Sequence, residues 1–320
     1  MDPSLFIPDI VQKIESVLGE LKLKPKNTPQ KFIKTTNGQK HRYSSVCENK
    51  LGEKSIFYAR LYKFASEKKK MVNEIKLGKF FRENPSVDFF PKYILSGIKK
   101  DFEWLVREYF PAKALEKEKQ IERLRKKLKN KDISNIVEKL RQMNNLPVSS
   151  FGFLEKFNLE KYFSLSEKIY REKFLTEKEM KRLETLIKEN KNILENENKY
   201  FCHGDFHIGN IILSDQSIKF IDLESVHINN FAFDIAFLTT RLWQNLKERK
   251  LFIEHYLTSL PPEKKEIFPS LFAFNAIFLG YDGFLSKPAE YSLKMIDKRR
   301  SFYKKLIRAA AKSFEKLVNI

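Results

Sequence analysis

The sequence predicts an α+β protein of two lobes, a small strand-rich lobe followed by a larger, mainly helical one. Short apolar runs separated by turn residues occupy much of residues 31–109, whereas helical periodicity dominates after Pro111. With 320 residues, 42% of them hydrophobic, the chain can bury a substantial core, which excludes a mainly disordered protein. We therefore expect a first lobe at residues 1–107, a hinge at residues 108–112 and a second lobe at residues 113–320.

The first lobe is expected to begin with a helix and to continue as an antiparallel sheet. Apolar residues at helical spacing predict a helix over residues 9–21. Asn37-Gly38 predicts a tight hairpin turn between two strands, because both residues tolerate positive φ angles. The other elements of this lobe are expected to be strands at residues 43–47, 55–62, 93–98 and 102–109, with a helix at residues 67–82.

The second lobe is expected to consist mainly of helices. An apolar seam at helical spacing predicts a helix over residues 114–143, and its members are Ile121, Leu124 and Leu128. Thr176 with Glu179 forms a capping box that opens another helix, which extends to about Leu194. The last amphipathic helix is expected at residues 297–318, and the chain has no internal repeat and no Gly/Ser linker.

The chain is strongly basic. Its 61 Lys and Arg residues exceed its 41 Asp and Glu residues, which gives a formal net charge of +20. This balance favours polyanionic partners such as nucleotide phosphates, nucleic acid or an anionic membrane. The most basic run, residues 123–131, contains no aromatic residue that could stack on bases. We therefore favour a solvated helix face for this run and keep nucleic-acid binding as an alternative.

Cysteine usage and the N-terminal sequence predict a cytoplasmic protein. Cys47 and Cys202 are far apart and have no metal-binding spacing, so neither a disulfide scaffold nor a structural zinc site is expected. The N-terminus lacks a basic region followed by an apolar stretch, which argues against a signal peptide. Without a window of about 20 apolar residues, no membrane span is expected.

One strand–loop–strand stretch interrupts the helical half and carries most of the chemistry-bearing residues. The apolar runs at residues 211–213 and 218–221 predict a short hairpin. Asp205, Asn210 and Asp222 lie at the ends of its loops. Two carboxylates and one amide suit a hard divalent cation together with one general base.

These residues form motifs that resemble the aminoglycoside phosphotransferase and choline kinase superfamily. Residues 203–210 read His-Gly-Asp-x-x-x-x-Asn, residues 221–224 read Ile-Asp-Leu-Glu, and residues 233–236 read Phe-Asp-Ile-Ala, in the order that this superfamily has. The resemblance covers roughly residues 31–245. It implies a protein-kinase-like fold and an enzyme that transfers a phosphoryl group from ATP, with Mg²⁺, to a hydroxyl group.

The resemblance also implies roles for individual residues. Asp205 would be the catalytic base that takes the proton of the substrate hydroxyl, and Asn210 and Asp222 would hold Mg²⁺. Arg60 would bind the phosphates of ATP with its planar set of donors. Glu74, on the following helix, would pair with Arg60 and orient it.

Further residues are implied to support the nucleotide and the catalytic loop. Glu108 and Phe110 belong to the hinge against which adenine would lie. His203 and Asp234 would brace the catalytic loop through hydrogen bonds to its backbone. Glu224 would either approach the metal or cap a turn. No role is assigned to the nearby His207.

The acceptor is expected to be a small hydroxylated molecule, such as an amino alcohol (choline or ethanolamine), an aminoglycoside or a sugar. A protein Ser/Thr kinase is the first alternative, but Gly204 stands where protein kinases carry Arg, and only 11 residues separate Asp222 from Asp234. A non-catalytic, kinase-like nucleotide-binding scaffold is the second, because the nucleotide loop at residues 35–40 has a single glycine. Five residues could line an acceptor pocket: Phe274, Tyr281, Asp282, Glu290 and Tyr291. For the aromatic residues among them we favour a place in the core.

Overall fold

The chain folds into two compact units, each described here by itself. The computed structural model describes residues 3–29, 34–36, 40–62, 71–98, 102–117, 120–158, 160, 168, 175–214, 217–286 and 291–320. One unit, the sheet unit, contains Met1–Ala112 with Lys219–Glu224, and the other, the helical unit, contains Lys113–Ile218 with Ser225–Ile320. The expected hinge thus ends where the first unit ends, but residues 219–224, expected in the second lobe, belong to the sheet unit.

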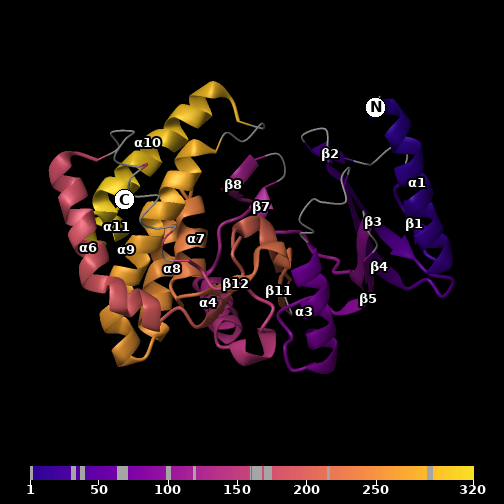
Figure 1. Cartoon of the computed structure of the whole chain (residues 1–320), viewed down its shortest axis with the longest axis horizontal. Helices are drawn as coiled ribbons and strands as arrows, with labels where there is room; N and C mark the ends of the chain where they lie inside the picture. The colour runs from indigo at the N-terminus through magenta and orange to yellow at the C-terminus, as the bar shows by residue number, and fades with distance from the viewer. Residues whose placement is uncertain are drawn as a thin grey trace. The chain divides into compact units, whose positions relative to one another are not determined.

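The sheet unit contains the predicted antiparallel sheet (Figure 1). Its strands are β1 (Lys24–Pro25), β2 (Lys34–Thr36), β3 (Lys40–Glu48), β4 (Lys54–Tyr62), β5 (Tyr93–Ile98) and β6 (Phe102–Glu108). Their order is β1-β3-β4-β6-β5, β2 also pairs with β3, and every pairing is antiparallel. The Asn37-Gly38 turn lies outside the described residues, although Thr36 and Lys40 on either side of it are paired.

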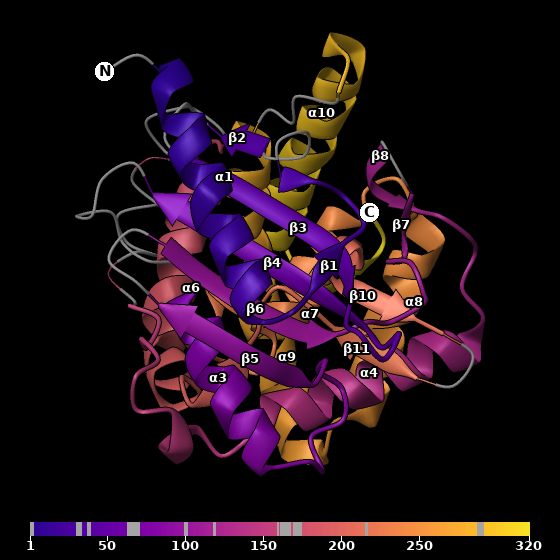
Figure 2. The ribbon, with the colours of Figure 1, turned by 90° about the vertical axis from the view of Figure 1, so that its right-hand side faces the viewer.

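Helix α1 (Pro3–Glu20) lies across one face of this sheet (Figure 2). Its buried residues pack on alternate residues of the strands, in one core of Ile10, Ile14, Val17, Leu18, Tyr43, Cys47, Phe57, Ala59, Phe102 and Val106. Because side chains alternate along a strand, Tyr58 and Arg60 of β4 lie on the opposite face. The predicted helix at 67–82 is α3 (Val72–Glu83), and residues 63–70 lie outside the described part.

The helical unit confirms the predicted helical half. Its α-helices are α4 (Asn130–Asn144), α6 (Glu177–Asn196), α7 (Phe233–Arg241), α8 (Leu246–Ser259), α9 (Pro262–Leu285), α10 (Leu293–Ala310) and α11 (Phe314–Val318). The capping box that opens α6 is present, with Thr176 Oγ1 accepting a hydrogen bond from Glu179 N at 3.3 Å. The expected last helix is divided into α10 and α11.

The helix predicted over residues 114–143 is wrong in its first half. That half forms the antiparallel strands β7 (Glu116–Lys117) and β8 (Gln120–Leu124), and the helix, α4, begins only at Asn130. In β8, Glu122 is buried and has a φ of 62°, a left-handed conformation that a helix cannot contain. Its carboxylate forms an ion pair with Arg299 at 2.7 Å. This long-range ion pair, rather than the helical spacing of the apolar residues, determines the local structure.

The helical part of the chain also contains two pairs of short strands, and one of its helices, α9, is unusually long and apolar. β9 (Tyr200–Cys202) pairs with β12 (His227–Asn229), and β10 (Ile211–Leu213) pairs with β11 (Ile218–Phe220) as the predicted hairpin. An 18-residue stretch of α9 has a mean hydropathy of 1.3, so by length and composition this helix could cross a membrane, although no membrane span was expected from the sequence. Since 67% of this stretch is buried inside the protein, α9 has the burial of a core helix.

Candidate active site

The backbone of the catalytic loop between β9 and β10 is held by hydrogen bonds to Asp234. The Asp234 carboxylate is fully buried and accepts hydrogen bonds from His203 N at 2.9 Å and Gly204 N at 3.1 Å. Asn144, at the end of α4, donates to the same carboxylate at 3.2 Å and to Phe201 O at 2.9 Å. Burial raises the pKa of Asp234 to about 6, although these hydrogen bonds oppose the rise. The expected bracing role of Asp234 is thus confirmed.

Gly204 is required by the shape of this loop. Its φ is +80°, and a Cβ atom on it would lie 2.0 Å from Ser225 O. A residue with a side chain would therefore both strain the backbone and collide with a carbonyl oxygen. An arginine at this position, as in protein kinases, is incompatible with the loop that this chain forms.

Asp205 follows Gly204 and presents its carboxylate to solvent, with 41% of the side chain exposed. Its neighbours are polar groups of the same loop: Asp205 N donates to His203 Nδ1 at 3.4 Å, and Asn210 Nδ2 donates to Asp205 O at 2.8 Å. The expected catalytic base and one expected metal ligand, Asn210, are therefore hydrogen-bonded to each other. His203 also has its expected supporting place.

His207 has a role that the sequence analysis did not assign. Its Nε2 lies 3.7 Å from Asp205 Oδ2, and its Nδ1 accepts a hydrogen bond from Gly209 N at 3.0 Å. Burial alone would raise the pKa of Asp205, but the neighbouring imidazole of His207 outweighs it and lowers that pKa, with His203 and Arg241 adding to the effect. The carboxylate is consequently ionised at neutral pH. The only sequence signal was the position of His207 two residues after Asp205.

Arg241, at the end of α7, belongs to a buried charge network that was also missed. It lies 3.5 Å from Glu122 and 2.9 Å from Asp282. Glu122 further accepts hydrogen bonds from Arg299 Nε and Trp243 Nε1, each at 2.7 Å. This network holds β8 against α7, α9 and α10, and places a guanidinium near the catalytic loop.

Of the residues considered for an acceptor pocket, the aromatic ones are mainly core. Phe274 and Tyr281 are fully buried, as favoured from the sequence. Tyr291 is half-buried and donates to Glu122 at 3.4 Å, while Asp282 pairs with Arg241. Glu290 lies outside the described residues.

In the sheet unit, Arg60 is fully buried on the face of the sheet opposite α1. Its Nη1 donates to Glu224 Oε2 at 2.7 Å, its Nη2 donates to Glu224 Oε1, and Nη2 also donates to Tyr58 OH at 3.2 Å. Burial lowers the pKa of Arg60, but Tyr58 and Glu224 raise it by more than burial lowers it. The net pKa is therefore raised, and the guanidinium stays charged. The structure thus gives Glu224 a third position, against Arg60, which neither expected role described.

The expected pairing of Arg60 with Glu74 is therefore wrong. Glu74, buried on α3, accepts a hydrogen bond from Tyr93 OH at 2.9 Å instead. Burial raises the pKa of Glu74 to about 7; the charge of Arg107 opposes this rise, and that of Asp222 adds to it. The negative charges of Glu74 and Asp222 thus oppose each other in the sheet unit.

Residues 219–224, which include Asp222 and Glu224, are held in the sheet unit by hydrogen bonds to its backbone. Phe220 N donates to Phe89 O at 2.8 Å, and Lys219 Nζ donates to Asp88 O at 2.7 Å. Asp222 has a φ of 69°, which is uncommon for a residue other than glycine. The segment is thus attached to the sheet unit at its start, and its turn at Asp222 is a strained one.

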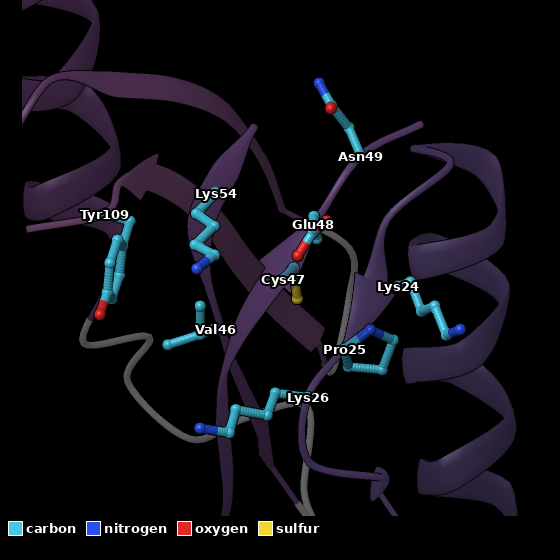
Figure 3. Close-up of a pocket in the computed structure, with 9 residues that line it drawn as sticks. All are labelled: Lys24, Pro25, Lys26, Val46, Cys47, Glu48, Asn49, Lys54 and Tyr109. Carbon is cyan, nitrogen blue, oxygen red and sulfur yellow. The ribbon is translucent and has the colours of Figure 1, made fainter. Parts of the chain in front are cut away.

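The predicted hinge residues Glu108 and Phe110 contact the same segment, and the residue between them borders a cavity. Lys219 Nζ lies 3.8 Å from Glu108 Oε1 and 5.6 Å from the centre of the Phe110 ring. Tyr109, between them, lines a pocket of about 490 Å³ with Val46, Lys26 and Lys54 among others (Figure 3). Figure 3 shows the ends of Lys26 and Lys54 turned toward the Tyr109 side of the pocket. Its volume falls in the range of small-molecule sites.

The site residues predicted from the sequence therefore form two groups. Arg60, Glu74 and Asp222 lie in the sheet unit with the hinge residues Glu108 and Phe110. Asp205 and Asn210 lie together on the catalytic loop of the helical unit.

Comparisons with known proteins agree with the resemblance seen in the motifs. The sequence pattern of the phosphotransferase enzyme family matches residues 49–265. No curated protein sequence matches the chain significantly.

Solved structures of several kinases share the fold. An amicoumacin kinase, hAmiN, in complex with AMP-PNP, Ca²⁺ and Ami has 12% sequence identity and a TM-score of 0.54, over 91% of this chain and 92% of the other. Choline kinase LicA from Streptococcus pneumoniae has 15% identity and a TM-score of 0.53, over 91% and 98%. Macrolide 2′-phosphotransferase MphH from Brachybacterium faecium has 11% identity and a TM-score of 0.54, over 90% and 96%. These similarities confirm the predicted kinase-like α+β fold.

Proposed function

The chain belongs to the phosphotransferase enzyme family, and from this premise we propose that it transfers the terminal phosphoryl group of ATP to a hydroxyl group of a small molecule. The observation that carries this proposal is Asp205, an exposed carboxylate on a loop fixed by Asp234. Because its pKa is lowered, Asp205 is ionised at neutral pH and able to accept the proton of a substrate hydroxyl.

Arg60 is the candidate ligand of the ATP phosphates. Phosphoryl transfer depends mainly on positioning and on neutralising the charge of the phosphates. Arg60 has a permanently charged guanidinium with donors in one plane, which match phosphate oxygens. The pocket beside Tyr109, the residue between Glu108 and Phe110, supports a place for the base of the nucleotide.

Asn210 and Asp222 are the candidate ligands of Mg²⁺, and their surroundings fit a cation. Asn210 donates its amide nitrogen to Asp205 O, which directs the amide oxygen to another partner. The charge of Asp222 raises the pKa of both Glu74 and Glu224, after the effect of burial, so a cation beside Asp222 would relieve this repulsion. When bound, Mg²⁺ would supply positive charge that neutralises the phosphates of ATP. Since no three His, Cys, Asp or Glu residues of the described chain form a metal site, phosphates are expected among its ligands.

The acceptor is proposed to be an amino alcohol such as choline or ethanolamine, an aminoglycoside or a sugar. A choline kinase, a macrolide phosphotransferase and an amicoumacin kinase are among the proteins that share the fold. The net charge of +20 disfavours a polycationic acceptor. A protein acceptor is less well supported, because Gly204 and the short Asp222–Asp234 interval depart from protein kinases.

The test is ATP consumption with Mg²⁺ against a panel of amino alcohols, sugars, nucleosides and aminoglycosides, with Asp205→Asn as the matched variant. We expect one class of compound to stimulate turnover and Asp205→Asn to abolish it, while nucleotide binding stays near the wild-type value. Unchanged turnover in Asp205→Asn would remove Asp205 from the mechanism. ATP binding without turnover on any compound would point to an acceptor outside the panel or to a macromolecular one, whereas the absence of both turnover and ATP binding would favour the non-catalytic scaffold.

A further inference from the structure

A second arginine lies directly beside Arg60. In the pairing of β3 with β4, Arg42 is the residue opposite Arg60. Residues opposite each other in an antiparallel pair lie on the same face of the sheet, with their Cβ atoms about 4.5–5.5 Å apart. The face of the sheet opposite α1 therefore carries two neighbouring guanidinium side chains.

Two like charges in this register repel each other and destabilise the sheet. Glu224 accepts hydrogen bonds from both Nη atoms of Arg60, and Arg60 Nη2 also donates to Tyr58 OH. The charges of Arg60 and Arg42 also act on Tyr58, whose pKa burial raises. Arg60 is thus paired with one carboxylate and one hydroxyl, and Arg42 lies next to it on the same face of the sheet.

This carboxylate does not satisfy all the donors of the two guanidiniums. Among the described residues, the Nε atoms of Arg42 and Arg60 are both buried and have no hydrogen-bond partner. A buried donor without an acceptor destabilises the protein, because it has lost its hydrogen bond to water. A ligand with several negative oxygens, such as a chain of phosphates, offers more acceptors than one carboxylate.

We propose that Arg42 is a second phosphate-binding residue, which with Arg60 forms a cross-strand guanidinium pair that binds the phosphates of the nucleotide in place of the Glu224 carboxylate. This inference rests on the proposed function. It assigns to the strand after the nucleotide loop a charge that can bind phosphates where that loop, at residues 35–40, has a single glycine. Glu224 is the partner of Arg60 until a nucleotide binds.

The test is equilibrium binding of ATP, ADP and adenosine by isothermal titration calorimetry, in EDTA and again with Mg²⁺. Arg42→Gln is expected to weaken ATP and ADP binding about 10- to 100-fold, as the loss of charged hydrogen bonds implies, and to leave adenosine binding unchanged. Arg82→Gln, on an exposed arginine of α3, removes the same charge and is the matched control. It is expected to bind all three ligands as the wild type does.

Thermal unfolding separates a phosphate-binding role from a structural one. Because Arg42 and Arg60 repel each other, Arg42→Gln is expected to melt at the wild-type temperature or above it while losing ATP affinity. A lower melting temperature with unchanged ATP affinity would identify Arg42 as structural and overturn the proposal. Arg42→Lys, which restores the charge but not the planar donors, is expected to recover only part of the affinity.

Glu224→Gln provides an independent measurement. A neutral amide competes less for the guanidiniums, so ATP binding in EDTA is expected to tighten several-fold; weaker binding would contradict the exchange of Glu224 for phosphate. If the wild type binds ATP and Arg42→Gln binds it equally well, only this inference is wrong. If the wild type binds neither ATP nor adenosine, the proposed function itself is wrong and this inference with it.

Discussion

Replacing Glu74 by Gln is expected to remove a pH dependence from the stability of the sheet unit. Burial raises the pKa of Glu74 from 4.5 to about 7, and its carboxylate accepts a hydrogen bond from Tyr93 OH. Because the folded-state pKa is the higher one, the stabilising contribution of the protonated group is fully present below about pH 4.5 and is lost as the pH rises through about 7.

The size of the effect follows from the two pKa values. One pKa unit corresponds to about 1.4 kcal/mol, so a rise from 4.5 to about 7 is worth roughly 3 kcal/mol in full. Most of it falls between pH 5 and pH 8, where the wild type is expected to lose about 2–3 kcal/mol through this group alone. Glutamine does not titrate and can still accept the hydrogen bond of Tyr93. The stability of Glu74→Gln relative to the wild type should therefore increase by that amount over this interval.

Urea unfolding at pH 5, 6, 7 and 8, without nucleotide or Mg²⁺, measures this difference. The chain has two tryptophans, Trp104 in the sheet unit and Trp243 in the helical unit. In a Trp243→Phe background, fluorescence therefore reports the sheet unit. Glu83→Gln, at an exposed position of the same helix, is the control and should leave the pH dependence unchanged. A constant difference between Glu74→Gln and the wild type across these pH values would refute a burial-raised pKa at Glu74.

Three further predictions concern the catalytic loop. His207→Ala removes the imidazole that lies 3.7 Å from Asp205 and lowers its pKa, so the acidic limb of the kcat/KM profile should move to higher pH; an unmoved limb would show that His207 does not act on the base. Asp234→Ala leaves two loop N–H groups without their acceptor and should lower the free energy of unfolding by about 2–4 kcal/mol in chemical denaturation, whereas a change below about 0.5 kcal/mol would contradict its bracing role. Gly204→Ala places a Cβ atom 2.0 Å from Ser225 O and should lower both the melting temperature and turnover; wild-type values of both would show that the loop can relax.

The local sequence was sufficient for the fold class and for the catalytic loop. Strand alternation and turn residues indicated the sheet, and the capping box at Thr176 marked the start of α6, because these signals act over a few residues. Asp205 and Asn210 are five residues apart, so the loop that joins them also brings them into contact. Asp234 could be recognised as their support because it belongs to the same ordered set of motifs.

The tertiary structure decided which charged groups pair with each other. Arg60 pairs with Glu224, 164 residues away in the sequence, rather than with Glu74, because residues 219–224 are attached to the sheet unit. Glu122 lies in a strand rather than in the predicted helix because Arg299, 177 residues further on, neutralises it inside the helical unit. A buried charge requires a partner of opposite charge, and the fold determines which one reaches it. Spacing along the chain gives the candidates for such a pair, and packing selects between them.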